Sequence, residues 1–383
     1  MLLKLFFATL GFLALIGAAE CLARLAIRRG RYFVLPPGQR ERNMLHRESH
    51  PQLEPVVRLV VNRLGERGRP LPKRGRVYRV LVVGGSAAES YTQDQDTQWP
   101  AALEAALRTP ASLRLLAADD AYVGNIGRSG VDSGSLDVIL SRVLPNYRHL
   151  DLIVIMVGAS DVLRWLEAGA PPSRSAAPLT EAELFSWNPS MKFGYSPRST
   201  ALFTWFRRLR EQFWVERRNV ARWMGRARRD RANALTIRED TPSPDVVLEA
   251  FRANMASVIR RAREVAARVL VVGQPWFEKA AYTPEEEALF WNGAVGQAYK
   301  GTVTEFFSTR VICSLMGEID VAAERLAVEA GVEFLRLQER VPASVEQFID
   351  HFHSTPAGAA RIGRLVAGAV LDPSGPVAGL PRK

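Results

Sequence analysis

The stretch Val80-Leu-Val-Val-Gly-Gly-Ser-Ala-Ala-Glu-Ser90 decides the fold. Its apolar, β-branched run is typical of a strand that is buried on both faces, as in a parallel sheet. Gly84 and Gly85 permit a tight turn, because glycine has no Cβ to clash. Ser86 follows at once, and Trp99 to Leu107 then has the pattern of an amphipathic helix. A serine in this place, at the carboxyl end of a strand, is how α/β folds present a nucleophile.

Alone, this stretch fits equally well a glycine-rich turn with an incidental serine. A second stretch, Asp350-His-Phe-His-Ser-Thr-Pro-Ala-Gly358, changes that balance. A serine nucleophile needs a base to take its proton and a carboxylate to hold that base in one tautomer. Asp350 and His353 are three residues apart, so one short turn can deliver both. We predict Ser86 as nucleophile, His353 as base and Asp350 as its orienting carboxylate, and we assign His351 to the rim.

The pairing of an early serine with a late Asp-x-x-His resembles the SGNH/GDSL hydrolase family, over roughly residues 80–371. Asn125-Ile-Gly-Arg-Ser-Gly130 is similar to the second block of that family. The resemblance implies that the backbone N–H of Gly130 binds an oxyanion. Gly158-Ala-Ser-Asp161 is similar to the third block, but Ser160 stands where the family has an oxyanion-binding Asn.

The sequence departs from the family at two positions. Gly85 stands where the commonest form of the first block has Asp, which affects turn geometry more than chemistry. Ser160 matters more, because a hydroxyl can donate one hydrogen bond but is shorter than an amide. Losing one oxyanion donor can cost about 10²–10³ in rate. Low activity or a rearranged oxyanion hole is therefore an alternative. We expect Asp161 to orient the turn of Ser160 or to cap the next helix.

The resemblance implies a three-layer α/β/α sandwich whose parallel sheet has about five strands in flavodoxin-like order. The strand patterns are Val77 to Val83, Ala121 to Val123, Leu152 to Val157, Arg268 to Val272 and Val332 to Leu335. The main helix patterns are Trp99 to Leu107, Ser135 to Val143, Pro244 to Ala267, Asp320 to Ala330 and Ala359 to Leu371. We divide the chain into an anchor (1–28), a basic linker (29–76) with a strand or two around Pro55 to Asn62, the hydrolase domain (77–372) with a helical insertion near 165–241, and a tail (373–383).

The N-terminal segment has an uncharged run from Leu5 to Ala19, about 15 residues, which is short for a full membrane span. Neighbouring apolar residues extend it if Glu20 lies at the interface. A cleaved signal peptide and a buried helix are the alternatives, but no convincing cleavage site follows. We favour an uncleaved membrane helix. The arginines after it would keep the domain cytoplasmic by the positive-inside rule, whereas the resemblance favours export, which we adopt.

The net charge of +11 indicates anionic surroundings, such as lipid, acidic polysaccharide or nucleic acid. A predicted helix from Trp205 to Arg231 interleaves aromatic and basic residues, and it could face any of these or simply be solvated. The absence of a nucleic-acid fold motif argues against nucleic acid. The two cysteines, Cys21 and Cys313, exclude a disulfide framework.

These observations predict a serine esterase that acts on an acylated small molecule or envelope polysaccharide. This chemistry requires neither a metal nor an organic cofactor. Two alternatives remain open at the level of the sequence. The same acyl-enzyme can pass its acyl group to a sugar hydroxyl, which makes the protein an acetyltransferase. Alternatively, Ser160 marks a non-catalytic binding or scaffold protein of an envelope assembly.

Overall fold

The computed structural model describes residues 1–372, so the predicted tail (373–383) lies outside the described residues. Its centre is a five-stranded parallel sheet in the order β10-β8-β5-β3-β4. The strands are β3 (Val77–Gly84), β4 (Asp120–Asn125), β5 (Leu150–Met156), β8 (Ala266–Gly273) and β10 (Glu333–Arg336). Counted along the chain, these five strands have the order 2-1-3-4-5, which is the flavodoxin-like arrangement. The predicted strand number and order are confirmed.

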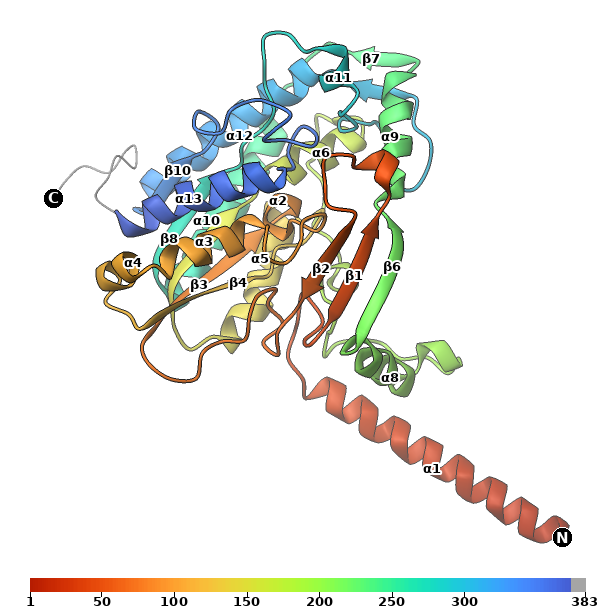
Figure 1. Cartoon of the computed structure of the whole chain (residues 1–383). Helices are drawn as coiled ribbons and strands as arrows, with labels where there is room; N and C mark the ends of the chain where they lie inside the picture. The colour runs from red at the N-terminus through yellow and green to blue at the C-terminus, as the bar shows by residue number, and fades with distance from the viewer. Residues whose placement is uncertain (373–383) are drawn as a thin grey trace.

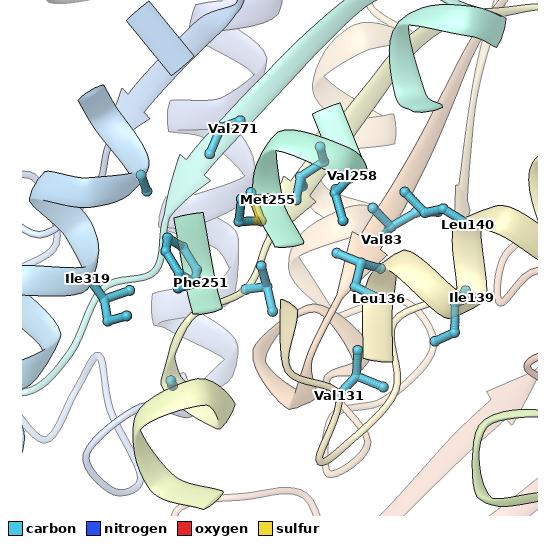
Figure 2. Close-up of a cluster of buried hydrophobic side chains, with 14 of the residues drawn as sticks. Val83, Val131, Leu136, Ile139, Leu140, Phe251, Met255, Val258, Val271 and Ile319 are labelled. Carbon is cyan, nitrogen blue, oxygen red and sulfur yellow. The ribbon is translucent and has the colours of Figure 1, made fainter. Parts of the chain in front are cut away.

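Helices cover both faces of this sheet and complete three layers (Figure 1). One face packs against α5 (Ser133–Val143), α6 (Ala159–Glu167), α10 (Asp245–Val265) and α12 (Thr309–Glu329). Figure 2 shows part of this packing, where side chains of α5 and α10 meet those of β3 and β8. The other face packs against α3 (Trp99–Leu107) and α13 (Pro356–Leu371). The predicted three-layer sandwich is therefore confirmed.

Strand β3 fits the centre of the sheet because its side chains alternate between two apolar layers. Leu81 and Val83 belong to the core on the α5–α10 side, whereas Val80 and Val82 belong to the core on the α3–α13 side. Each is buried, and burying such a side chain stabilises the fold by about 1.5–3 kcal/mol. At the end of the strand, a Cβ on Gly84 would lie 1.9 Å from the Met156 carbonyl oxygen. Only glycine allows the turn to pass this close to β5.

The predicted helix from Trp205 to Arg231 is wrong, and the insertion around it is not wholly helical. Three elements occupy this stretch: α8 (Ala201–Glu211), β6 (Trp214–Val220) and α9 (Arg222–Ala232). Strand β6 pairs in parallel with β1, a partner far away in the sequence. Asn219 and Ala221 adopt left-handed backbone, with φ of 54° and 58°, which breaks a helix at this point.

The stretch predicted as a basic linker with a strand or two (29–76) contributes two strands, and one of them, β2, lies within the expected Pro55 to Asn62. In this second sheet, of order β2-β1-β6, β1 (Arg40–Leu45) pairs antiparallel with β2 (Val56–Val60). Beyond β2, Arg67 is 1% exposed and donates hydrogen bonds to the carbonyls of Glu89, Ser90 and Gln93. The linker residues therefore brace the segment that follows Ser86.

The remaining elements are short. They are α2 (Ser86–Glu89), α4 (Pro110–Leu115), α7 (Glu181–Leu184), β7 (Thr236–Arg238), α11 (Pro284–Glu287), β9 (Glu305–Phe307) and the 3₁₀ turns at Arg47–Ser49, Leu144–Asn146 and Pro197–Ser199. Strands β7 and β9 form a separate two-stranded parallel sheet. In Figure 1, this small sheet lies at the end of the molecule opposite α8.

The N-terminal helix α1 (Leu2–Arg28) projects away from the domain (Figure 1). It has 27 residues, and its most apolar 18-residue window has a mean hydropathy of 2.1 and is not buried at all. By length and composition it can cross a membrane. Near its end, Ile27 is buried against Trp187 and Ala201, so the helix is joined to the domain by packing as well as by the chain.

Candidate active site

The structure brings Ser86, His353 and Asp350 together, although the serine and histidine are 267 residues apart. Ser86 is the first residue of α2, directly after the turn that ends β3. Its Oγ lies 2.8 Å from His353 Nε2, and His353 Nδ1 lies 2.8 Å from Asp350 Oδ2. Both distances are those of hydrogen bonds. The arrangement can withdraw a proton from the hydroxyl while the carboxylate holds the imidazole.

Asp350 is held as a carboxylate by its hydrogen-bond donors. Burial alone would raise the pKa of Asp350. The opposing effects are larger: the charge of His353, the hydrogen bond from its ring, and the hydrogen bonds from the backbone N–H groups of Phe352 and His353. Together they hold the pKa of Asp350 well below its usual range. For His353, burial works to lower the pKa, and the nearby Asp350 charge outweighs it and raises the pKa. The imidazole is therefore a stronger base than a free histidine.

Trp291 completes the surroundings of the carboxylate, and the sequence did not reveal it as a site residue. Its indole Nε1 donates a 2.7 Å hydrogen bond to Asp350 Oδ2. Its ring also lies nearly parallel to the His353 imidazole, at 9° with 6.3 Å between centroids. The residue stands in an irregular stretch after α11, with no motif around it. Only the folded chain places it beside the Asp-x-x-His loop.

His351 is buried, so its assignment to the rim is wrong. Its ring stacks on Phe290 with 3.9 Å between centroids, and its nitrogens lie 3.1 Å from Asn292 Oδ1 and 3.2 Å from Thr309 Oγ1. Burial first, and then the charge of Arg231, put its pKa well below the usual value. His351 is therefore a neutral structural residue that secures the loop from inside.

The predicted oxyanion residues line the same cleft as Ser86 and His353. Gly130 has left-handed backbone, with φ of +77°, in the loop that passes beside Gly85. Ser160 is the second residue of α6, and its Oγ lies 3.5 Å from the point that a Cβ on Gly85 would occupy. Ser86 begins a helix, so its own N–H has no acceptor within that helix. Ser86, Gly130 and Ser160 thus line one cleft, and each carries a group that can donate a hydrogen bond.

Asp161 links the turn of Ser160 to the neighbouring helix. It is buried and accepts hydrogen bonds from the backbone N–H of Ser133, at 3.0 Å, and from the Ser133 hydroxyl. Burial raises its pKa to about 6. Because Ser133 is the first residue of α5, Asp161 stabilises the start of α5 and at the same time fixes the start of α6. Its position thus agrees with an orienting role for the turn.

The cleft has a volume of about 850 Å³, and both aromatic and charged residues line it. Trp223 meets the rings of Trp291 and Tyr299 edge to face, with centroid distances of 4.8 and 6.4 Å. The cleft is also lined by charged residues, namely Arg164, Arg174, Lys300, Glu167 and Glu183, and Lys300 lies over the Tyr299 ring at 5.5 Å. Burial raises the pKa of Glu167 to about 7. Among residues 1–372, no group of three His, Cys, Asp or Glu side chains is placed to hold a metal ion.

Comparison with known proteins gives distant structural neighbours only. No family model matches the chain, and no curated protein matches it. A catalytic mutant of the acetylxylan esterase Axe2 from Geobacillus stearothermophilus is 12% identical, with a TM-score of 0.41, and the match covers 82% of this chain and 100% of that one. LAE5, an α/β hydrolase enzyme from the metagenome of Lake Arreo, Spain, is 12% identical, with a TM-score of 0.39 and coverage of 77% and 96%.

Ser160 provides a direct test of the oxyanion donors. If its hydroxyl binds the oxyanion, Ser160→Ala is expected to lower kcat by about tenfold or more with a smaller change in KM, because the bond is strongest in the transition state. Ser160→Asn should keep or raise kcat, since the amide reaches further. Steady-state hydrolysis of p-nitrophenyl acetate measures both. An unchanged kcat in Ser160→Ala would mean that the Ser86 and Gly130 amides suffice.

Proposed function

We propose that this protein is a serine esterase of the SGNH/GDSL type, with Ser86 as nucleophile, His353 as general base and Asp350 as the group that orients it. The observation that carries the proposal is the continuous hydrogen-bonded chain from Asp350 through His353 to Ser86, with 2.8 Å at each step. The chain ends in a cleft large enough for a ligand. The strand order and the four sequence blocks support the same assignment.

In the proposed reaction, Ser86 Oγ attacks the ester carbonyl carbon while His353 Nε2 takes the hydroxyl proton. The carbonyl oxygen becomes an oxyanion and accepts hydrogen bonds from the N–H groups of Ser86 and Gly130 and from the Ser160 hydroxyl. Collapse of this intermediate breaks the ester C–O bond, and His353 gives the proton to the leaving alcohol. A water molecule then attacks the acyl-enzyme by the same route and frees Ser86.

We propose an acylated carbohydrate as the substrate. The aromatic residues Trp223, Trp291 and Tyr299 offer apolar ring surface, and the charged residues that line the same cleft offer donors and acceptors for hydroxyl groups. Trp291 belongs both to these aromatic residues and to the hydrogen bonds of Asp350. A sugar ring held there would stand directly beside the triad. The net charge of +11 suits a polysaccharide that also carries anionic groups.

Ser160 in place of the expected Asn keeps two further candidates, acyl transfer to a sugar hydroxyl and a non-catalytic scaffold. A fluorophosphonate probe and an acetylated oligosaccharide separate the three. We expect probe labelling of Ser86 and release of acetate that is unaffected by added acceptor sugar. Acetylated acceptor in place of free acetate would identify a transferase. Absence of both labelling and turnover would overturn the enzymatic proposal.

We further propose that α1 is an uncleaved membrane anchor and that the catalytic domain is exported. Fractionation tests the anchor. The full chain should remain in the membrane pellet at high salt, because salt screens surface charges but does not weaken a hydrophobic span. Deleting Met1 to Ala19 should make the protein soluble while keeping Glu20 and Ile27, which contact the domain. A full-length protein that salt extracts would show that the basic surface, not a span, holds it at the membrane.

A further inference from the structure

The underside of the domain, beside the end of α1, exposes apolar side chains that a soluble surface rarely carries. Helix α8 presents Phe203 and Phe206 to solvent, with 42% and 63% of each residue exposed, and Phe213 directly after it is 73% exposed. Arg207 and Arg210 lie on the same helix. An apolar stripe flanked by arginines is the pattern of a helix that lies in a membrane interface.

A hydrogen-bonded joint fixes this helix to the membrane anchor. The Glu20 carboxylate on α1 accepts from the backbone N–H of Ala201, at 3.0 Å, and of Leu202, at 2.9 Å, which are the first two residues of α8. A carboxylate at a helix N-terminus satisfies donors that have no partner within that helix. Arg24 holds the same carboxylate with a 2.7 Å bond from Nε. The charge in the anchor therefore has a structural purpose.

The joint also sets the depth of α8. The apolar part of α1 from Leu2 to Ala19 rises by about 27 Å at 1.5 Å per residue, close to the thickness of about 30 Å of a bilayer core. Glu20, the next residue, then lies at the boundary between hydrocarbon and headgroups. Because the first two residues of α8, Ala201 and Leu202, are hydrogen-bonded to Glu20, the start of α8 lies at that boundary too. Figure 1 shows α8 beside the end of α1 that meets the domain.

A basic groove continues this surface toward the domain. It has a volume of about 1230 Å³ and is lined by the end of α1, by the chain around β1 and β2, and by α8. None of the described residues that line the groove is acidic. Five cationic residues line it: Arg31, Arg40, Arg63, Lys73 and Arg208. Its apolar part includes Phe33, Trp187 and Trp205, and the Arg208 guanidinium stacks on the Trp187 ring at 3.8 Å.

We propose that the basal surface, defined as α8 with Phe213 and this groove, docks on the anionic phospholipids of the membrane that holds α1. The phenylalanines enter the interface, and the groove cations bind lipid phosphates. Lipid is the partner because the surface continues the apolar anchor at the depth where headgroups lie. Docking would hold the domain, and hence the mouth of the cleft, in one orientation over the membrane. The inference rests on α1 being a span but not on the esterase proposal.

The test uses the full chain in nanodiscs, in a background where Cys21 and Cys313 are replaced by serine and alanine. An environment-sensitive fluorophore is attached at Phe206→Cys and, as a matched control, at Leu235→Cys. Leu235 is 83% exposed and precedes β7, at the end of the molecule opposite α8 (Figure 1). Nanodiscs contain either phosphatidylcholine alone or its mixture with phosphatidylglycerol, and some carry lipids with a quencher near the headgroup.

We expect a blue shift and quenching at position 206, stronger with phosphatidylglycerol, and neither effect at position 235. In the combined variant Arg31→Gln, Arg63→Gln and Lys73→Gln, the ratio of docked to undocked label in anionic nanodiscs should fall about fivefold for each cation removed. Circular dichroism melting checks that each variant is folded. The blue shift and quenching of the label at position 206, measured with the groove cations intact, are the reference with which the triple variant is compared.

Three results would overturn the proposal. A label at position 206 that stays as exposed as the one at 235 would remove the membrane contact. An unchanged preference for phosphatidylglycerol in the triple variant would remove the groove from it. If inorganic phosphate alone, in detergent without lipid, produced the blue shift of the label at position 206, the groove would be assigned to a soluble phosphate compound. Loss of esterase turnover bears on the triad only, so the two proposals fail independently.

Discussion

Ser86→Ala is expected to abolish hydrolysis of p-nitrophenyl acetate while the melting temperature stays within a few degrees of that of the unmodified protein. The substitution removes the atom that forms the acyl-enzyme in the proposed reaction, so kcat should fall by about 10⁴-fold or more. The fold loses little, because Ser86 is half-buried at the open end of β3 and its hydroxyl makes one hydrogen bond, to His353. Such a bond contributes about 1 kcal/mol. Turnover measures kcat, fluorophosphonate labelling reports whether the nucleophile is present, and thermal unfolding gives the melting temperature.

Ser175→Ala is the matched control for this experiment. Ser175 is a partly buried serine that lines the same cleft, but it is not part of the Ser86, His353 and Asp350 chain. Its removal should leave both kcat and labelling near those of the unmodified protein. If Ser86→Ala retained turnover, Ser86 would be removed from the mechanism. If both variants lost activity equally, the cleft rather than the nucleophile would be the sensitive feature.

The fold could be predicted from the sequence wherever neighbouring residues decide the structure. Strand β3 carries apolar side chains at every position from Val80 to Val83, which only a strand covered on both faces can bury. Helix α3 was predicted over Trp99 to Leu107 and begins and ends at those residues. These elements then repeat in alternation, so the parallel sheet follows from the connection rules.

Of the second sheet, only the strand pattern near Pro55 to Asn62, where β2 lies, could be predicted, because the partner that makes β6 a strand lies far away in the chain. Locally, Trp214 to Val220 is a basic, aromatic stretch between two helices, and it favours continued helix. Pairing with β1 overrides that preference. The burial of Arg67 was equally hidden, because a basic stretch with Pro and Gly is usually solvated.

Some residues of the candidate site could be predicted from local motifs, and others could not. Ser86 and the Asp350 to His353 loop stand in short motifs, so their types and order indicated a shared task before any geometry was known. Trp291 and the burial of His351 depend on how the irregular chain after α11 folds back onto that loop. No periodicity marks such a contact. Residues that support a site from outside its motifs are the ones that sequence analysis missed.

Asp350→Asn should lower kcat by about 10⁴-fold even though it changes only one functional group. The carboxylate now receives hydrogen bonds from the N–H groups of Phe352 and His353 and from Trp291 Nε1. An amide has only one oxygen for these donors, and its NH₂ group must point at a remaining donor or at His353 Nδ1. Facing Nδ1, it makes that nitrogen an acceptor and leaves the proton on Nε2, where the base must be free. The wrong tautomer therefore faces Ser86.

The pH profile distinguishes this loss from general damage to the site. His353 must be neutral to act as a base, and Asp350 raises its pKa. In the unmodified protein, kcat/KM should thus fall as the pH drops through this raised pKa. Without the carboxylate charge, the residual activity of Asp350→Asn should show its acid limb at lower pH. Asp137→Asn is the control: this carboxylate pairs with Arg261 of α10 and is not among the residues that line the cleft, so its replacement should move neither kcat nor the limb.

Asp350→Asn should also lower the stability of the folded protein. A donor left without a partner in a buried site costs about 1–3 kcal/mol, so the melting temperature should fall while the protein stays folded. A variant that melts lower, keeps its fluorophosphonate site accessible and shows the shifted acid limb would establish Asp350 as the residue that orients and charges His353. A variant with kcat near that of the unmodified protein would show that Ser86 takes its activation from another base, and the triad assignment would fail.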